Sequence, residues 1–128
     1  MEQLEFDFKE RRKVMIVGKS FKFDSAHYLP GHNKCGEIHG HTYTLEVRVK
    51  GEVNRDGMVM DLHKLKEIVE GIIQPFDHQL LNEFISNPTC ENLSLIIFKA
   101  IKSELEEWLT LESVKVQEGG GGYAICTG

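Results

Sequence analysis

The chain has 128 residues, of which 41% are hydrophobic and 27% charged, which is typical of one globular domain and excludes a disordered or fibrous protein. Its net charge of −5 argues against a general nucleic-acid-binding protein, because such a protein needs a basic surface. No apolar run approaches the roughly 20 residues that span a bilayer, and residues 1–13 are charged where a signal peptide would be apolar. We therefore expect a cytoplasmic protein with a single domain at residues 14–128, preceded by an N-terminal extension of uncertain order at residues 1–13.

Two strands that carry histidines are expected in the first half of the chain. From Val14 onward apolar and polar residues alternate, which predicts a half-buried strand, and His27 falls in phase with its apolar face. Residues 29–37 contain a proline and two glycines, which predict a loop. A second strand then begins at His39, and its alternation places His39 and His41 on the apolar face.

Two amphipathic helices follow these strands. Asp61 is an expected N-cap, after which apolar residues recur at helical spacing until Pro75 ends the helix. A second helix is predicted from about Thr89, with an apolar face that reaches Trp108.

The chain ends with two further predicted strands. Alternating valines lead into Glu118, and the four glycines at residues 119–122 connect this strand to a short one that holds Tyr123 and Ile125. The short connections favour antiparallel pairs. The expected fold class is α+β, with a four-stranded antiparallel sheet in the order strand, strand, helix, helix, strand, strand and two helices on one face.

Three histidines form a candidate metal site. His39 and His41 are two residues apart on one strand, so their imidazoles point the same way and can bind one ion at about 2.0 to 2.1 Å. His27 can supply a third ligand if the two strands pair. Three neutral histidines with one open position are typical of a catalytic Zn²⁺ site, because structural zinc sites usually have four protein ligands.

Two other interpretations of these histidines remain open. They can be ordinary core residues that form hydrogen bonds with their neighbours. Alternatively, a structural zinc knuckle can use His32 and Cys35 together with His39 and His41, because the His-x-x-Cys spacing suits a metal.

Further residues suit proton transfer and ligand binding. Cys35 lies four residues before His39, where a nearby metal ion would favour the thiolate, which can act as a base. The adjacent Asp77 and His78 offer a carboxylate that can orient an imidazole, although this dipeptide alone is weak evidence. Glu118 lies in phase with the buried valines, where an unpaired charge is costly, so a ligand with paired N–H donors would satisfy it. The three cysteines are an odd number, and we assign Cys90 and Cys126 as small buried hydrophobic residues.

Six segments carry a more specific pattern, and they read FDSAHYLP, CGEIHGHTY, GMVMDLHKLK, FDHQLLN, NPTCEN and VKVQE. Through them the chain from about Phe21 to Glu118 resembles the 6-pyruvoyltetrahydropterin synthase and 6-carboxytetrahydropterin synthase family. The resemblance implies a tunnel-type fold, in which the sheets of several subunits join into a barrel. It also implies a homohexamer of two stacked trimers with active sites between subunits.

The resemblance assigns a role to each candidate residue, with 7,8-dihydroneopterin triphosphate as the substrate. It implies zinc ligands at His27, His39 and His41, a base at Cys35, a second proton-handling pair at Asp77 and His78, a pterin anchor at Glu118, and pocket residues at Thr89 and Glu91. Two positions depart from the family pattern. Gly119 stands where the family commonly has threonine, and Gly36 stands where a related subgroup has a catalytic glutamate, so Cys35 remains the expected base.

The favoured reaction is zinc-dependent formation of 6-carboxytetrahydropterin, acetaldehyde and triphosphate, for queuosine biosynthesis. The compact chain with Cys-Gly-x-x-His-Gly-His is more similar to the bacterial carboxy-forming enzymes of the family. The alternative is a 6-pyruvoyltetrahydropterin synthase, which eliminates triphosphate for tetrahydrobiopterin synthesis. A third possibility is a non-catalytic zinc- or pterin-binding module, which would keep the histidines and Glu118 but would not need Cys35 or the Asp77–His78 pair.

Overall fold

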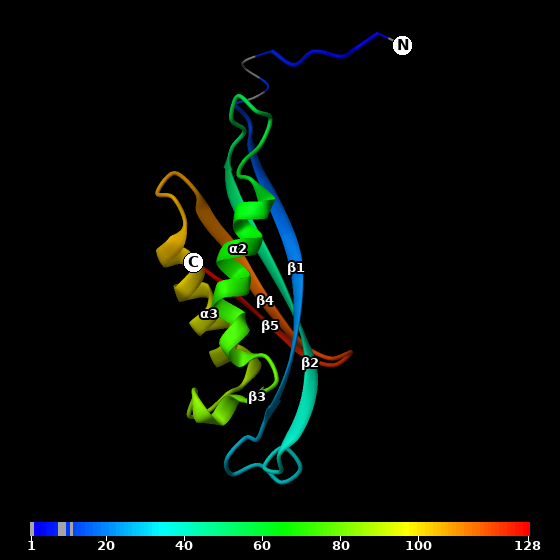
Figure 1. The fold of residues 1–128 in the computed structure, drawn as a ribbon, viewed down its shortest axis with the longest axis vertical. Coiled ribbons are helices and arrows are strands. Elements are labelled where there is room, and N and C mark those ends of the chain that lie inside the picture. The colour runs from blue at the N-terminus through cyan, green and yellow to red at the C-terminus, as the bar shows by residue number, and fades with distance from the viewer. Residues whose placement is uncertain (1, 8–9, 11) are drawn as a thin grey trace.

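The computed structural model describes residues 2–7, 10 and 12–128 and has an α+β fold, with two helices on one face of a five-stranded sheet (Figure 1). The elements are β1 (Val14–His27), β2 (His39–Glu52), α2 (Leu62–Ile73), the 3₁₀ helix η1 (Gln74–Phe76), β3 (Gln79–Leu80), the 3₁₀ helix η2 (Leu81–Glu83), α3 (Cys90–Glu104), β4 (Thr110–Glu118) and β5 (Tyr123–Thr127). The expected extension at residues 1–13 includes residues 1, 8, 9 and 11, which lie outside the described part. The boundary at residue 14 therefore remains a prediction.

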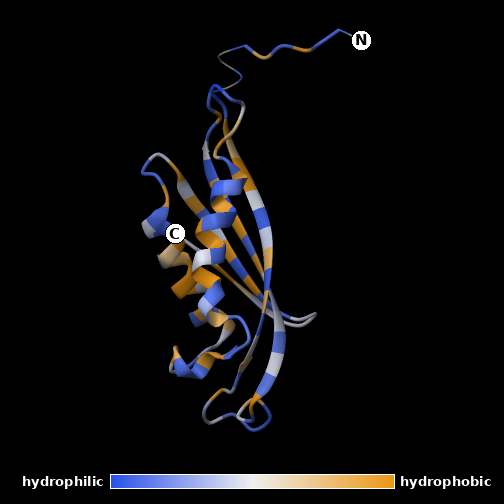
Figure 2. Cartoon of the chain, viewed as in Figure 1, coloured by the Kyte–Doolittle hydropathy of each residue, from blue (hydrophilic) through white to orange (hydrophobic). Residues whose placement is uncertain are grey.

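The hairpin of β1 and β2 forms the longest part of the sheet. Each strand has 14 residues, and they pair antiparallel from Val14 opposite Glu52 to His27 opposite His39. Both strands alternate in burial over much of their length, and the alternation of hydropathy is visible along them (Figure 2). This unbroken register brings the histidine-bearing ends of the two strands together, as the sequence predicted.

The hydrophobic core lies between the sheet and the two helices. From the sheet, fully buried residues such as Leu45, Val47 and Val114 point toward the helices. Leu65 and Leu93, which lie on α2 and α3, have no exposed surface and pack in the same cluster. Since the other face of the sheet carries mainly polar residues, the alternation of each strand decides which side chains face the helices.

Local signals determine where both helices begin. The side chain of Asp61 accepts a hydrogen bond from the His63 N–H at the start of α2, and Thr89 accepts one from Asn92 at the start of α3. Pro75 lies in η1 directly after α2. The predicted N-cap at Asp61 and the predicted start of the second helix near Thr89 are therefore confirmed. Within the described residues no helix has the length and apolar character needed to cross a membrane.

Two fold expectations are wrong. The sheet is not four-stranded and antiparallel, because the two-residue strand β3 pairs parallel with β1 at Ser25 and Ala26 and makes it a mixed five-stranded sheet. Such a short strand leaves no alternation in the sequence that could reveal it. Trp108 does not belong to α3, which ends at Glu104; it lies in the turn before β4 and is 72% exposed. The chain must reverse there to return to the sheet.

Replacing Leu93 by alanine is expected to lower the free energy of unfolding by about 3 kcal/mol, because it leaves a cavity in a closely packed core. The same change at Leu95, which lies on the same helix but is 42% exposed, is expected to cost less than about 0.5 kcal/mol. Urea denaturation of both variants measures the difference. Equal losses would mean that Leu95 is also buried in the folded protein in solution.

Candidate active site

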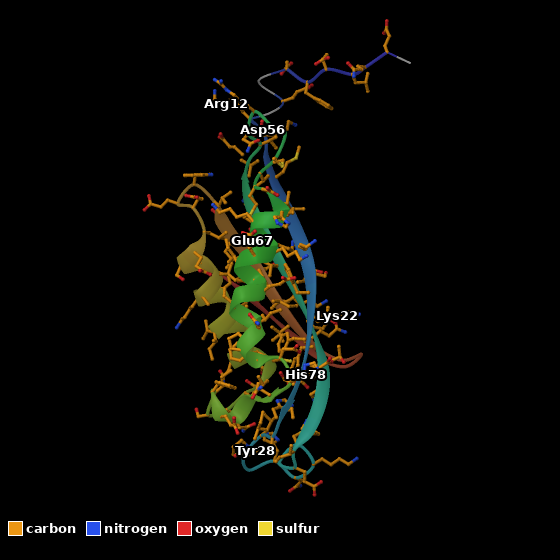
Figure 3. All side chains as sticks on the ribbon, in the orientation of Figure 1. Arg12, Lys22, Tyr28, Asp56, Glu67 and His78 are labelled. Carbon is orange, nitrogen blue, oxygen red and sulfur yellow. The ribbon has the colours of Figure 1, made fainter. Side chains whose placement is uncertain are left out.

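Three imidazoles converge at one end of the β1–β2 hairpin. His27 ends β1, and His39 and His41 are the first and third residues of β2. Their ring centroids are 4.6 to 5.0 Å apart, and one nitrogen from each lies within 4.8 Å of the others. The structure therefore brings together the three histidines that the sequence predicted. Tyr28, which follows His27, lies at this end of the molecule, far from Arg12 and Asp56 at the other end (Figure 3).

The hydrogen bonds of two rings leave their lone pairs facing each other. His27 Nδ1 lies 2.8 Å from the Pro88 carbonyl oxygen, and His39 Nδ1 lies 2.7 Å from that of Glu37. A carbonyl oxygen can only accept, so each Nδ1 carries the proton and each Nε2 of a neutral ring is unprotonated. These two Nε2 atoms are only 3.0 Å apart. Two lone pairs at this distance repel unless a cation lies between them.

His41 completes the group, and its surroundings favour the neutral form of its ring. Burial lowers the pKa of His41; the Glu118 carboxylate opposes this shift, and the rings of His27 and His39 add to it. Its Nε2 is buried and has no hydrogen-bond partner within the described residues. Three imidazoles, two of them oriented by backbone carbonyls, are a donor set that fits a divalent transition-metal ion.

This arrangement argues against both of the non-catalytic interpretations of the histidines. Core histidines would be expected to donate to or accept from one another, whereas here the facing nitrogens are both acceptors. In the zinc-knuckle interpretation His32 and Cys35 would be ligands, but both are exposed, and among the described residues neither joins the close group of ligand atoms.

A carboxylate and a thiol lie next to the histidines. Glu118, the last residue of β4, has Oε2 3.4 Å from His41 Nε2, and its Oε1 accepts a hydrogen bond of 3.1 Å from the Cys90 thiol. The Tyr43 hydroxyl is buried nearby and has no partner among the described residues. Cys90 is thus more than the small hydrophobic residue that we expected, since it is buried but makes a polar contact.

Asp77 and His78 form a second cluster on the other face of the sheet. His78 Nδ1 lies 3.0 Å from Asp77 Oδ2, which confirms that the carboxylate contacts the imidazole. The Asp24 N–H donates to Asp77 Oδ1, and the Asp24 side chain accepts from Thr42, so both outward-facing strand residues belong to this cluster. An open hollow of about 620 Å³ is lined by Asp24, Thr42 and His78 among others.

In this second cluster the backbone of His78 has an uncommon conformation, and the Asp77 carboxylate is held in its charged form. His78 adopts a φ of 58°, which is uncommon for a residue with a side chain, and its N–H donates to the Asp24 carbonyl. The Asp24 N–H, followed by the His78 side chain, lowers the pKa of Asp77. The carboxylate is therefore ionised at neutral pH and can hold the proton of His78 on Nδ1, which leaves Nε2 to exchange a proton.

Cys35 lies in the loop between β1 and β2 and is exposed. It does not join the close group of ligand atoms that the described residues form. A Cβ atom at Gly36 would collide with the His32 carbonyl oxygen in this loop, so the glutamate of the related subgroup would not fit here. The base role of Cys35 stays a prediction.

The remaining candidates lie around the start of α3 and the end of β4. Thr89 uses its side-chain oxygen to cap α3, and Glu91 is exposed in the first turn of the same helix. Their places in a ligand pocket stay predictions. Gly119 has a φ of 52°, which favours glycine, so the threonine common in the family would be strained in this backbone.

Three residues that contact these groups were not predicted from the sequence. Asp24 lies in phase with the polar face of β1, where an isolated carboxylate carries no signal. Tyr43 is two residues after His41 on the same strand face, so the alternation could have placed it beside the three histidines. Cys90 could not be linked to Glu118, because 28 residues separate them.

Comparison with known proteins gives the family. The family model described as 6-pyruvoyl tetrahydropterin synthase matches residues 16–128. The chain is 46% identical over 110 residues to an Archaeoglobus fulgidus protein provisionally named 6-carboxy-5,6,7,8-tetrahydropterin synthase, covering 86% of this chain and 93% of the relative. It is 41% identical to the dihydroneopterin monophosphate aldolase of Pyrococcus furiosus, covering 84% of this chain and 91% of the aldolase.

A solved structure agrees with this result. The structure of Caenorhabditis elegans 6-pyruvoyl tetrahydropterin synthase aligns with a TM-score of 0.82 and 26% identity, and the alignment covers 92% of this chain and 98% of that one. Fold and sequence thus point to the same group of proteins. The chain belongs to the 6-pyruvoyl tetrahydropterin synthase family.

Proposed function

We propose that the protein is a zinc-dependent 6-carboxy-5,6,7,8-tetrahydropterin synthase of queuosine biosynthesis. It converts 7,8-dihydroneopterin triphosphate and water to 6-carboxytetrahydropterin, acetaldehyde and triphosphate. The observation that carries the proposal is the convergence of His27, His39 and His41, with two facing Nε2 lone pairs, beside the Glu118 carboxylate.

In this proposal each residue of the site has a separate role in the reaction. Glu118 accepts hydrogen bonds from the ring N–H groups of the pterin and so directs the side chain of the substrate toward the three histidines. A zinc ion bound by these histidines would polarise the side-chain hydroxyls and make the adjacent C–H and O–H groups more acidic. Cys35 takes up a proton as the base, and His78, oriented by Asp77, exchanges a proton on the other side of the substrate. Thr89 and Glu91 line the pocket.

We infer that each active site is built between subunits of a cytoplasmic homohexamer. The histidines face the helices of their own chain, whereas Asp77 and His78 lie on the outer face of the sheet. A substrate that meets both groups would therefore sit between two chains. Two open sheet edges support such an assembly, because β5 pairs only with β4 and most of β1 lacks a neighbour on its outer side among the described strands.

A second candidate function is that of a dihydroneopterin monophosphate aldolase. The supporting observation is the 41% identity to the Pyrococcus protein of that name. The same residues could serve it, since both reactions break a carbon–carbon bond in the side chain of a dihydropterin. The 6-pyruvoyltetrahydropterin synthase reaction keeps all side-chain carbons and so differs from both in its product. A non-catalytic zinc- or pterin-binding module would form no product at all.

Mass spectrometry of the reaction products tests the proposal. The zinc-loaded protein is incubated separately with 7,8-dihydroneopterin triphosphate and with the monophosphate. We expect 6-carboxytetrahydropterin and acetaldehyde from the triphosphate. A 6-pyruvoyl product would assign the protein to the triphosphate-eliminating reaction, and a 6-hydroxymethyl product from the monophosphate would assign it as the aldolase. No product from protein with bound zinc and an intact oligomer would favour the binding module.

A further inference from the structure

Cys90 holds a defined position behind the Glu118 carboxylate. It is the first residue of α3, directly after the N-cap Thr89, and only 7% of its surface is exposed. Its thiol donates to Glu118 Oε1 over 3.1 Å. The cap of the helix therefore fixes the backbone that carries the thiol, and the thiol contacts one particular oxygen of the carboxylate.

The thiol remains a hydrogen-bond donor throughout the neutral pH range. Burial raises the pKa of Cys90 to about 12, and the hydrogen bond with Glu118 and the negative charge of that residue add to this effect. A thiol in this environment does not act as a nucleophile, because only the thiolate is reactive. Its remaining chemical capacity is to donate to Glu118.

A second donor beside this carboxylate lacks a partner. The Tyr43 side chain has no exposed surface, and within the described part of the chain its hydroxyl forms no hydrogen bond. A phenol is protonated at neutral pH, so this hydroxyl can donate a hydrogen bond. A buried hydroxyl without a partner is costly, and a ligand at Glu118 would provide one.

We propose that Cys90 is a positioning residue that sets the selectivity of Glu118 for a 2-amino-4-oxopteridine ring. The thiol uses one of the roughly four acceptor positions of the carboxylate and thereby fixes the rotation of its plane. The remaining positions then face a ligand with two adjacent N–H donors, and Tyr43 offers its hydroxyl to the same ligand. The identity of the ring rests on the proposed function, whereas the role of Cys90 rests on its contact with Glu118.

Binding of two ring compounds without side chains, pterin and lumazine, distinguishes a positioning role of Cys90 from a role in packing alone. Both compounds can be followed by absorbance or fluorescence. Pterin carries the 2-amino group, and lumazine has an oxygen in its place, so only pterin offers both N–H donors. Binding of each compound to the full-length, zinc-loaded protein is measured by equilibrium titration for the wild type, Cys90→Ala and Cys90→Ser. Cys126→Ala, which removes a thiol that does not contact Glu118, is the matched control.

We expect the wild type and Cys126→Ala to bind pterin more tightly than lumazine. Cys90→Ala should lose about tenfold of this preference, because a hydrogen bond to a charged group is removed, and Cys90→Ser should retain it. Thermal unfolding of both Cys90 variants verifies that they fold.

Two results would overturn the positioning role of Cys90 but leave the proposed function standing. One is an unchanged preference for pterin over lumazine in Cys90→Ala, and the other is a loss of affinity that is equal for both compounds. A wild-type protein that does not prefer pterin would overturn the proposed function, and this inference with it.

Discussion

The His39→Ala variant is expected to lose its bound metal and about a thousandfold of its turnover, because a catalytic metal contributes several kcal/mol and each 1.36 kcal/mol is a factor of ten. His39 Nε2 faces His27 Nε2 at 3.0 Å, and its Nδ1 is oriented by the Glu37 carbonyl oxygen. Without this ring only His27 and His41 remain as ligands, and of these only His27 is oriented by a backbone carbonyl. Metal content is measured by mass spectrometry after dialysis, and turnover is measured on the same samples.

The matched control is His63→Ala. His63 lies on α2 with 72% of its side chain exposed and pairs with Glu67 at 3.4 Å, so its removal should change neither metal content nor turnover. If His39→Ala kept one equivalent of metal with the affinity of the wild type, His39 would not be a ligand. Loss of metal in both variants would place the metal elsewhere on the protein.

Co-expressed Cys35→Ala and His78→Ala subunits are expected to form mixed oligomers that regain turnover, although each variant alone should lose about a hundredfold to ten-thousandfold as for other acid–base residues. The reason is that the two residues act from different faces of the sheet. His78 lies on the outer face, whereas the histidine cluster, at which Cys35 is proposed to act, lies on the inner face. In a 1:1 mixture about one quarter of the sites would combine an intact Cys35 from one chain with an intact His78 from its neighbour.

A second mixture provides the control. Wild-type subunits co-expressed with the double variant Cys35→Ala/His78→Ala should give about one quarter of wild-type turnover if sites lie between chains, but about one half if each chain holds a complete site. Oligomer size and zinc content are checked in every sample. If the mixture of single variants stays inactive with normal size and zinc, the proposed site between subunits is wrong.

The Asp77 carboxylate stays ionised in the neutral pH range in which these mixtures are assayed. The Asp24 N–H and the His78 side chain hold the pKa of Asp77 below its ordinary value, so the carboxylate remains charged as the pH falls from neutral into the mildly acidic range. If turnover is measured as a function of pH, a loss of turnover in the mildly acidic range therefore does not come from protonation of Asp77.

Patterns that act over short distances were readable in the sequence. Alternation along two long strands placed His27, His39 and His41 on one face, and the structure brings them together. The two helix starts followed from Asp61 and Thr89, because an N-cap satisfies backbone donors within the next three residues. Such features depend on chain neighbours or on the two-residue period of a strand, and both are visible in a sequence.

The tertiary structure alone decided the features that join distant segments. β3 exists because the segment after α2 meets the edge of β1, and the contact of Cys90 with Glu118 exists because α3 packs on β4. The placement of Asp77 and His78 on the outer face likewise depends on hydrogen bonds with Asp24, which is 53 residues away from Asp77. The sequence by itself determined the residue types, the strand faces and the helix starts of this protein. Only the fold determined which side chains meet, because packing between elements far apart in the chain selects those contacts.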